Sequence, residues 1–226
     1  MTQDEPGAAA PAPVSANLAR RLPALLLAFA AVLAGAVAAR HRLLTQAALP
    51  PTAVATLYPA PRPLPPFELT AQDGSRFDGA RLRGHWSLLL FGFTSCADAC
   101  PTTLLELAAA RRSLADLPAA LAPQVVLVSV DPARDTPARL ADYLRHFDAG
   151  FIGLTGAPAT LAGLAARLGV AVQRGAVVEG SYTVDHGATV FLVDPQAAVT
   201  AIFPLPHRAR AIAADYRAII GAHRAG

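Results

Sequence analysis

The feature that most constrains the fold is a set of short apolar runs that alternate with helical patterns. Four runs have strand length, at residues 86–91, 125–130, 151–154 and 189–193. Their apolarity is continuous rather than alternating, so we expect strands that are covered on both faces of a sheet. Four helical patterns lie between and after them, at residues 101–117, 137–147, 158–168 and 208–220. This alternation predicts an α/β fold with helices on both faces of a central sheet.

Local signals at the ends of these elements agree with that prediction. Three of the helical patterns begin with proline, which is favoured at the first helical position, and Thr136 is a suitable N-cap for the second. Residues 67–77, with a turn at Asp73-Gly74, predict a hairpin ahead of the first long strand.

The only two cysteines, Cys96 and Cys100, directly follow the first long strand, at the start of the first helical pattern. Two sulfurs four positions apart at a helix start can reach the same side of one turn and hold one soft metal ion. The backbone N–H groups and the positive end of the helix dipole there favour the thiolate form. The alternatives are a buried pair of small apolar side chains or a local disulfide, whose short loop would constrain the unfolded chain little.

The order strand, short loop, cysteine and helix is how thioredoxin-like proteins present their sulfurs at the C-terminal edge of a sheet. The plain thioredoxin motif has two residues between its cysteines, and this chain has three. The sequence therefore predicts a thioredoxin-like domain, and the longer spacing shifts the prediction from redox chemistry toward metal binding.

A metal site needs a third ligand, and His186 is the best placed of the six histidines. It precedes the 189–193 strand, in a loop at the sheet edge that could face the cysteines. Asp185 beside it could orient the imidazole from outside the ligand set. Asp98, between the cysteines, is either a weak extra ligand or a solvated charge. For the other histidines we expect structural or surface roles; they are His41, His85, His146, His207 and His223.

Two further acids, Asp131 and Asp135, follow the 125–130 strand. We interpret them as loop-forming and capping residues, because nothing in the sequence pairs them for acid/base work.

Hydrophobic residues make up 54% of the chain, which is high for a soluble domain and directs attention to residues 22–39. This uncharged run is just long enough to cross a bilayer, and two arginines flank each of its ends. We predict an uncleaved, single-pass anchor in a bacterial-type inner membrane, with the C-terminal domain in the periplasm. The alternative is a cleaved signal peptide, for which Ala36-Val37-Ala38 has a suitable small-x-small form.

The sequence divides into four predicted parts. They are a disordered tail at 1–19, the anchor with its arginine flanks at 20–42, a proline-rich stalk at 43–66 and one folded domain at 67–226. All basic residues are arginine, and the 14 arginines of the predicted domain balance its 14 acids. A neutral domain lacks the basic face that a nucleic-acid partner requires, so we expect no such partner.

Three blocks of sequence together resemble the Sco/SenC family of copper proteins, which serve cytochrome c oxidase assembly. The first is Phe-Gly-Phe-Thr-Ser-Cys-Ala-Asp-Ala-Cys-Pro-Thr-Thr-Leu at 91–104, the second is Val-Ser-Val-Asp-Pro-Ala-Arg-Asp-Thr-Pro at 128–137, and the third is Val-Asp-His at 184–186. They occur in the order of the family, and the resemblance spans roughly residues 64–220. Two departures are Ala97, where the family usually has proline, and Gly187, where it often has serine.

The resemblance implies a thioredoxin-like fold in which Cys96, Cys100 and His186 bind one copper ion, as Cu(I) or Cu(II). It also implies a partner, the cytochrome c oxidase subunit that carries the dinuclear Cu-A site, with another copper chaperone or a thiol reductase as further candidates. Neither departure from the family removes a donor atom. Two thiolates and an imidazole suit copper in either oxidation state and leave a position open for transfer, whereas a structural zinc site prefers a fourth ligand.

The leading hypothesis is therefore a membrane-anchored copper metallochaperone for the Cu-A centre. The first alternative is a thiol-disulfide oxidoreductase that uses Cys96 and Cys100 as a dithiol to reduce the cysteines of that centre. A peroxiredoxin-like peroxidase, with Cys96 attacking peroxide and Cys100 resolving, is a further alternative. A membrane-bound copper or redox sensor has only the predicted anchor in its favour.

Overall fold

The computed structural model describes residues 23, 26–37, 49–175, 182 and 184–225. The chain divides into two compact units, Met1–Ala48 and Leu49–Gly226. In the first unit residues 26–37 form a helix. Among the described residues, no helix combines the length and the apolarity that a membrane crossing needs. Of the predicted 20–42 anchor, only Pro23 and residues 26–37 are described. The predicted tail at 1–19 lies outside the described residues.

The second unit is built on one eight-stranded sheet. Its spatial order is β1-β10-β9-β4-β5-β6-β2-β3. These strands are β1 (Thr56–Pro63), β2 (Glu68–Ala71), β3 (Arg76–Asp78), β4 (Ser87–Gly92), β5 (Gln124–Ser129), β6 (Ile152–Thr155), β9 (Val190–Val193) and β10 (Ala198–Phe203). β4, β5 and β6 are parallel, and the antiparallel strands β9 and β2 extend the sheet on either side of them. A separate antiparallel hairpin joins β7 (Val172–Arg174) to β8 (Val184–His186).

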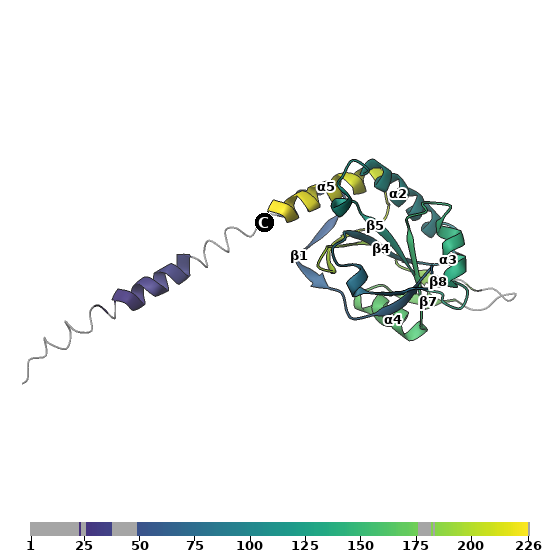
Figure 1. The fold of residues 1–226 in the computed structure, drawn as a ribbon, viewed down its shortest axis with the longest axis horizontal. Helices are drawn as coiled ribbons and strands as arrows, with labels where there is room; N and C mark the ends of the chain where they lie inside the picture. The colour runs from purple at the N-terminus through teal and green to yellow at the C-terminus, as the bar shows by residue number, and fades with distance from the viewer. Residues whose placement is uncertain (1–22, 24–25, 38–48, 176–181, 183, 226) are drawn as a thin grey trace, which may run out of the picture. The chain divides into compact units, whose positions relative to one another are not determined.

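Helices cover both faces of the sheet, as the sequence predicted (Figure 1). They are α2 (Ala99–Ser113), α3 (Pro137–Leu144), α4 (Pro158–Arg167) and α5 (Ala209–Ala225), with short 3₁₀ turns η1 (Gly79–Arg81) and η2 (Ala119–Leu121). Along β4, Leu88 and Leu90 pack into the cluster formed with α2, α3 and α5, whereas Leu89 and Phe91 pack into the cluster formed with α4. Every residue of β4 is buried, which explains its unbroken apolar run.

The predicted strands, hairpin and helices all appear, with boundaries that shift by a few residues. The proline-rich stalk predicted at 43–66 is wrong for its second half, because Thr56–Pro63 form β1 and pair antiparallel with β10. β1 is an edge strand whose pairing is irregular between Leu57 and Arg62, and proline is tolerated at such edges and bulges because its missing N–H breaks no ladder bond there. Residues 43–48 lie outside the described part of the chain.

A buried carboxylate on α5 fastens the segment ahead of β1. Asp215 accepts hydrogen bonds from the backbone N–H groups of Ala53, Val54 and Ala55, at 2.8, 2.8 and 2.7 Å. The folded unit therefore begins earlier than the 67–226 domain that the sequence predicted.

The sheet topology brings the cysteine segment and the histidine segment to one edge. β4 ends at Gly92, opposite Ser129 at the end of β5, and the chain continues through a short loop into α2. β9 runs antiparallel to β4 with Val190 opposite Leu90, so the residues that precede β9 lie at the same edge. Segments about ninety positions apart in sequence thus meet beside the carboxyl ends of the parallel strands.

Candidate metal centre

Cys96, Cys100 and His186 lie together at this edge. Each offers one ligand atom, and the three atoms all lie within 4.8 Å of one another. The Cys100 Sγ is 3.3 Å from the His186 Nε2, and both cysteines are free thiols. The structure therefore brings together the three residues that the sequence predicted as ligands.

The two cysteines are placed by the end of β4 and the start of α2. The Cys96 N–H donates to the Phe93 carbonyl at 3.3 Å, which closes the loop after the strand. The backbone N–H of Cys100 donates to the Cys96 Sγ at 3.4 Å, so an amide from the first turn of α2 points at a sulfur. The sequence prediction relied on such a contact, between a backbone N–H group at the start of the helix and a cysteine sulfur.

Cys100 is 2% exposed, and its burial, followed by a hydrogen bond with Cys96, raises the pKa of its thiol well above the ordinary value. The expected thiolate at the helix start is therefore wrong for Cys100 in the metal-free protein, because desolvation outweighs the helix dipole. Around it, Phe93 and Val184 complete a small apolar cluster against which Cys96, Val130 and Tyr182 pack. A bound cation would replace the proton and compensate the sulfur charge.

His186 is the last residue of β8 rather than part of a loop, which corrects the predicted position. Its Nδ1 lies 3.1 Å from the Gly187 carbonyl, which can only accept, so Nδ1 carries the proton. In the neutral imidazole Nε2 is then the nitrogen without a proton, and it is directed at the Cys100 Sγ. The Phe93 ring meets the imidazole edge-to-face at 5.7 Å between centroids. This tautomer and orientation are those that a metal-ligating histidine needs.

The SCO1/SenC family model matches residues 57–221, which include the whole site. The chain belongs to the SCO1/SenC family. A protein of Stutzerimonas stutzeri described as a candidate copper-binding protein is 41% identical over 189 residues, 83% of this chain and 87% of that protein. The structure of Bradyrhizobium japonicum ScoI with copper bound is 34% identical, with a TM-score of 0.63 over 70% of this chain and 99% of that one.

A second Sco structure, of the protein called BsSco, shares 21% identity and a TM-score of 0.57, over 76% of this chain and 99% of that one. At that identity the likeness concerns the fold alone. BsSco is described as having a disulfide switch and as a member of the Sco family of cytochrome c oxidase assembly proteins. These comparisons confirm the resemblance to the Sco/SenC family and the thioredoxin-like fold that the sequence predicted.

The two acids predicted to tune this Sco site differ in what the structure shows. Asp98 is exposed at the N-terminal boundary of α2, and its carboxylate accepts only a long hydrogen bond from the Thr102 hydroxyl, at 3.4 Å. It stands outside the cluster of three ligand atoms, which favours the solvated charge over the extra ligand. The backbone of Asp185 belongs to β8, but its side chain lies outside the described part of the structure.

Of the remaining histidines in the described region, none joins the Sco site. His207 is buried between the Thr103 hydroxyl and the Phe203 carbonyl, at 3.0 and 3.1 Å, and burial lowers its pKa. His223 packs edge-to-face on Trp86, and His85 and His146 are exposed. His41 lies outside the described residues.

Sequence reasoning undervalued the loop between β5 and α3. Asp131 and Asp135 are buried, and Thr136 alone caps α3, accepting from the Arg139 N–H. The two carboxylates instead bind the segments that carry the ligands. The sequence held one signal of this role: two acids directly follow a strand that is buried on both faces. Carboxylates in such a place are buried too, and buried carboxylates require hydrogen-bond partners.

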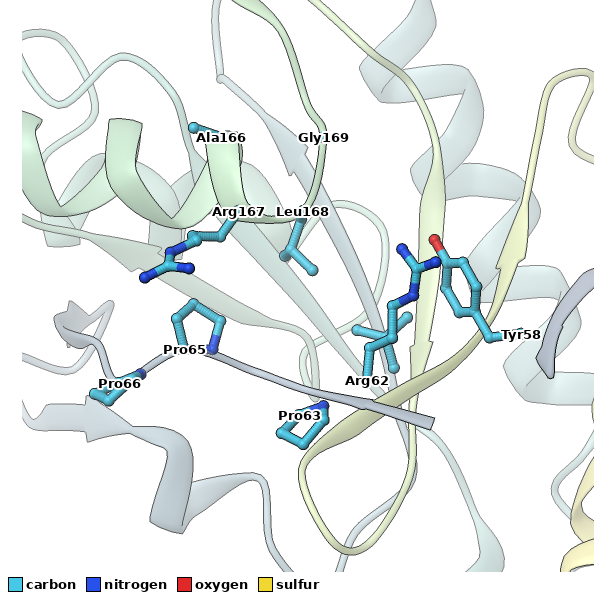
Figure 2. Close-up of a pocket in the computed structure, with 10 residues that line it drawn as sticks. Tyr58, Arg62, Pro63, Pro65, Pro66, Ala166, Arg167, Leu168 and Gly169 are labelled. Carbon is cyan, nitrogen blue, oxygen red and sulfur yellow. The ribbon is translucent and has the colours of Figure 1, made fainter. Parts of the chain in front are cut away.

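Two hollows in the described part of the surface are lined by none of the three ligands. One of about 530 Å³ lies between β1 and the end of α4, where Figure 2 shows Arg62 beside Tyr58 and Arg167 over Pro65; none of the three ligands lines it. Another, of about 380 Å³, adjoins the histidine hairpin and is lined by Tyr182 and Val184 among others. The candidate metal centre is therefore assigned from its donor atoms rather than from a cavity.

Proposed function

We propose that this Sco protein binds one copper ion through Cys96, Cys100 and His186 and serves assembly of the Cu-A centre of cytochrome c oxidase. The observation that carries the proposal is the convergence of two thiols and one imidazole nitrogen within 4.8 Å, from segments far apart in sequence. The copper-bound ScoI relative and the description of the family as oxidase assembly proteins support the choice of metal and of pathway.

The donor chemistry fits copper. Thiolate is a soft ligand and imidazole a borderline one, a combination that suits both oxidation states of copper. Three protein donors leave a coordination position through which a receiving protein can take the ion by ligand exchange. Phe93 and Val184 hold the site in an apolar setting, and the tautomer of His186 leaves its donor nitrogen free.

The membrane anchor and the periplasmic location are part of the proposal. The uncharged run at 22–39 supports the anchor, and the helix at 26–37 lies within it. A copper donor tethered in this way would lie on the same side of the membrane as the copper centre of a membrane oxidase that it supplies. Exported compartments are oxidising, so the two thiols would need a reductant before loading.

A second candidate function is thiol-disulfide exchange with the cysteines of the Cu-A site. The observation in its favour is that Cys96 and Cys100 are both free and have their sulfurs within 4.8 Å. Oxidation of the pair to a disulfide removes two electrons and two protons, which pass to the partner disulfide as it is reduced. The same oxidation would remove two of the three copper ligands, so the two functions exclude each other at any one moment.

Copper titration of the reduced full chain tests the proposal, beside Cys96→Ser, Cys100→Ser and His186→Ala, with His146→Ala as the control for loss of an exposed imidazole. We expect one equivalent bound by wild type and by the control, and lost in the other three variants. His186→Ala should keep its dithiol-disulfide cycling, because the imidazole takes no electrons. Undiminished copper binding by all variants would refute the site. If wild type binds no copper but cycles between dithiol and disulfide, the copper proposal is refuted and thiol-disulfide exchange is the function that remains.

A further inference from the structure

The loop between β5 and α3, residues 131–135, contacts both segments that carry the proposed copper ligands. Its two aspartates, Asp131 and Asp135, are buried, although none of the loop residues is a ligand. Two of its side chains reach in different directions, Asp135 toward the cysteine segment and Arg134 toward the histidine hairpin.

The first arm of the loop is Asp135, a fully buried carboxylate. Its oxygens accept from the Thr94 backbone N–H at 3.1 Å, from the Thr94 hydroxyl at 2.6 Å and from the Ser129 hydroxyl at 2.7 Å. Thr94 lies two residues before Cys96, in the stretch that connects β4 to α2. Arg139 adds a donor from α3 to the Thr94 hydroxyl, at 2.7 Å. Asp135 therefore restrains the conformation of the segment between β4 and Cys96 through its hydrogen bonds to Thr94.

The second arm is Arg134 together with Asp131. The Arg134 Nε donates to the Asp131 carboxylate, and its Nη1 donates to the Tyr182 carbonyl at 3.1 Å. The Tyr182 hydroxyl donates to the other oxygen of Asp131 at 2.5 Å, and the guanidinium lies over the Tyr182 ring at 3.8 Å. Tyr182 lies four residues before His186. Arg174, on the partner strand β7, covers the same ring at 3.5 Å.

A stack of rings extends this arm to the histidine itself. The Arg134 guanidinium lies 5.6 Å from the centroid of the Phe93 ring, and Phe93 meets the His186 ring edge-to-face. The same arginine thus places a positive charge close to a site in which two thiols would lose their protons and become thiolates on loading.

Hydrogen bonds within the loop connect its two arms. The backbone N–H groups of Arg134 and Asp135 donate to the Asp131 carbonyl, at 3.1 and 2.9 Å. The Ser129 hydroxyl accepts from the Asp131 N–H at 3.0 Å while it donates to Asp135, which ties the loop to the end of β5. The Thr136 cap then fixes the start of α3.

We infer that residues 131–135 act as a clamp that holds the cysteine pair and the histidine at the separation required for copper, with Asp135 and Arg134 as positioning residues. The inference rests on the proposed function, since the geometry it explains is that of the copper site. Hydrogen-bond partners that orient metal ligands typically change metal affinity 10- to 100-fold when removed. The two arms also act differently, because only Asp135 is hydrogen-bonded to the segment that carries the thiols, whereas Arg134 meets that segment only at the Phe93 ring.

Tyr182→Phe tests the histidine arm, because it deletes the hydroxyl that binds Asp131 and keeps the ring. We expect the copper dissociation constant to rise about 10-fold, while the equilibrium constant of the Cys96–Cys100 dithiol with glutathione stays at the wild-type value. Thr94→Val tests the cysteine arm with a side chain of nearly the same shape. It should weaken copper binding by a similar factor and also change the glutathione equilibrium severalfold.

Controls separate positioning from general stability. Ser113→Ala deletes an exposed hydroxyl that binds only its own helix, and Arg145→Gln removes the exposed ion pair with Asp142. Each variant is measured as the full chain for copper affinity, for the thiolate-to-Cu(II) charge-transfer absorption, for the glutathione equilibrium and for thermal unfolding without metal. Arg134→Gln is the second variant of the histidine arm, and its charge-transfer band should shift in addition.

The outcomes distinguish this inference from the function on which it rests. Wild type that binds no copper would refute the proposed function, whatever the variants do. Wild type that binds copper, with Tyr182→Phe, Arg134→Gln and Thr94→Val unchanged in affinity and absorption but lowered in melting temperature, would show that the loop only stabilises the fold. Equal changes in the glutathione equilibrium for both arms would contradict the separation into two arms.

Discussion

Gly92 is the position where a single methyl group should disturb the copper site most directly. It is the last residue of β4, and a Cβ built there would lie 2.9 Å from the Leu127 Cδ1 and 3.1 Å from the Cys100 Sγ. Ordinary carbon contacts are about 3.5–4.0 Å, so Gly92→Ala must displace each neighbour by about half an ångström. β4 is hydrogen-bonded to β5 and β9 on its two sides, which prevents the backbone from moving away.

The expected magnitude follows from these contacts. Overpacking a well-filled core costs about 1–3 kcal/mol, and the reduced freedom of the unfolded chain returns about 0.4–1 kcal/mol. The net loss in the free energy of unfolding should be about 1–2 kcal/mol. Metal sites tolerate displacements of about 0.2 Å in ligand distance, so moving the Cys100 sulfur by more than that should weaken copper binding about 10-fold or more.

The assay is urea unfolding of the metal-free chain together with competition for copper against a chelator of known affinity. Gly163→Ala is the matched control, because Gly163 lies in α4 with nothing within 4 Å of its added Cβ. Alanine there should stabilise the helix by about 0.5–1 kcal/mol and leave copper affinity unchanged. Gly92→Ala with wild-type copper affinity and wild-type stability would refute the close approach of β4 to Cys100.

Two further predictions concern the framework of the domain. Asp215→Asn should lower the free energy of unfolding by about 1–3 kcal/mol in urea titration, because an amide nitrogen cannot accept from the N–H groups ahead of β1; Asp142→Asn, at an exposed site, should change it little. Burial lowers the pKa of His207, so its neutral form is favoured by folding and the unfolded chain binds the proton more readily. Stability should therefore fall as the pH drops below about 6.5, and the fall between pH 7.5 and 5.5 should be smaller in His207→Gln; equal losses would contradict this assignment.

The sequence predicted the central elements because their signals are local. β4 and β5 are buried on both faces, so their apolar runs are continuous, and the helices carry proline or threonine at their starts. Cys96 and Cys100 are only four positions apart at the entry to α2, so their spacing alone indicated a common site. His186 was singled out by its position before a core strand at the sheet edge, and the resemblance to a family motif then supported its role as a ligand.

The elements that the sequence missed depend on distant partners. β1 has the composition of an extended stalk, and only its pairing with β10 and the bonds to Asp215 make it part of the sheet. The thiolate expected at Cys100 failed for a similar reason, because the cluster that buries it comes from Phe93 and from Val184 in the hairpin. Burial and long-range pairing are properties of the assembled fold, which spacing along the chain does not encode.

X-ray absorption spectroscopy of the chain loaded with one equivalent of copper tests the central claim most directly, because it identifies the atoms bound to the metal. The account predicts two sulfur neighbours and one imidazole nitrogen for wild type. Cys96→Ser, Cys100→Ser and His186→Ala should not retain the copper equivalent, so neither the sulfur nor the imidazole scattering of this site should survive in them. A copper ion surrounded by nitrogen and oxygen alone, or an imidazole signal that persists in His186→Ala, would contradict it.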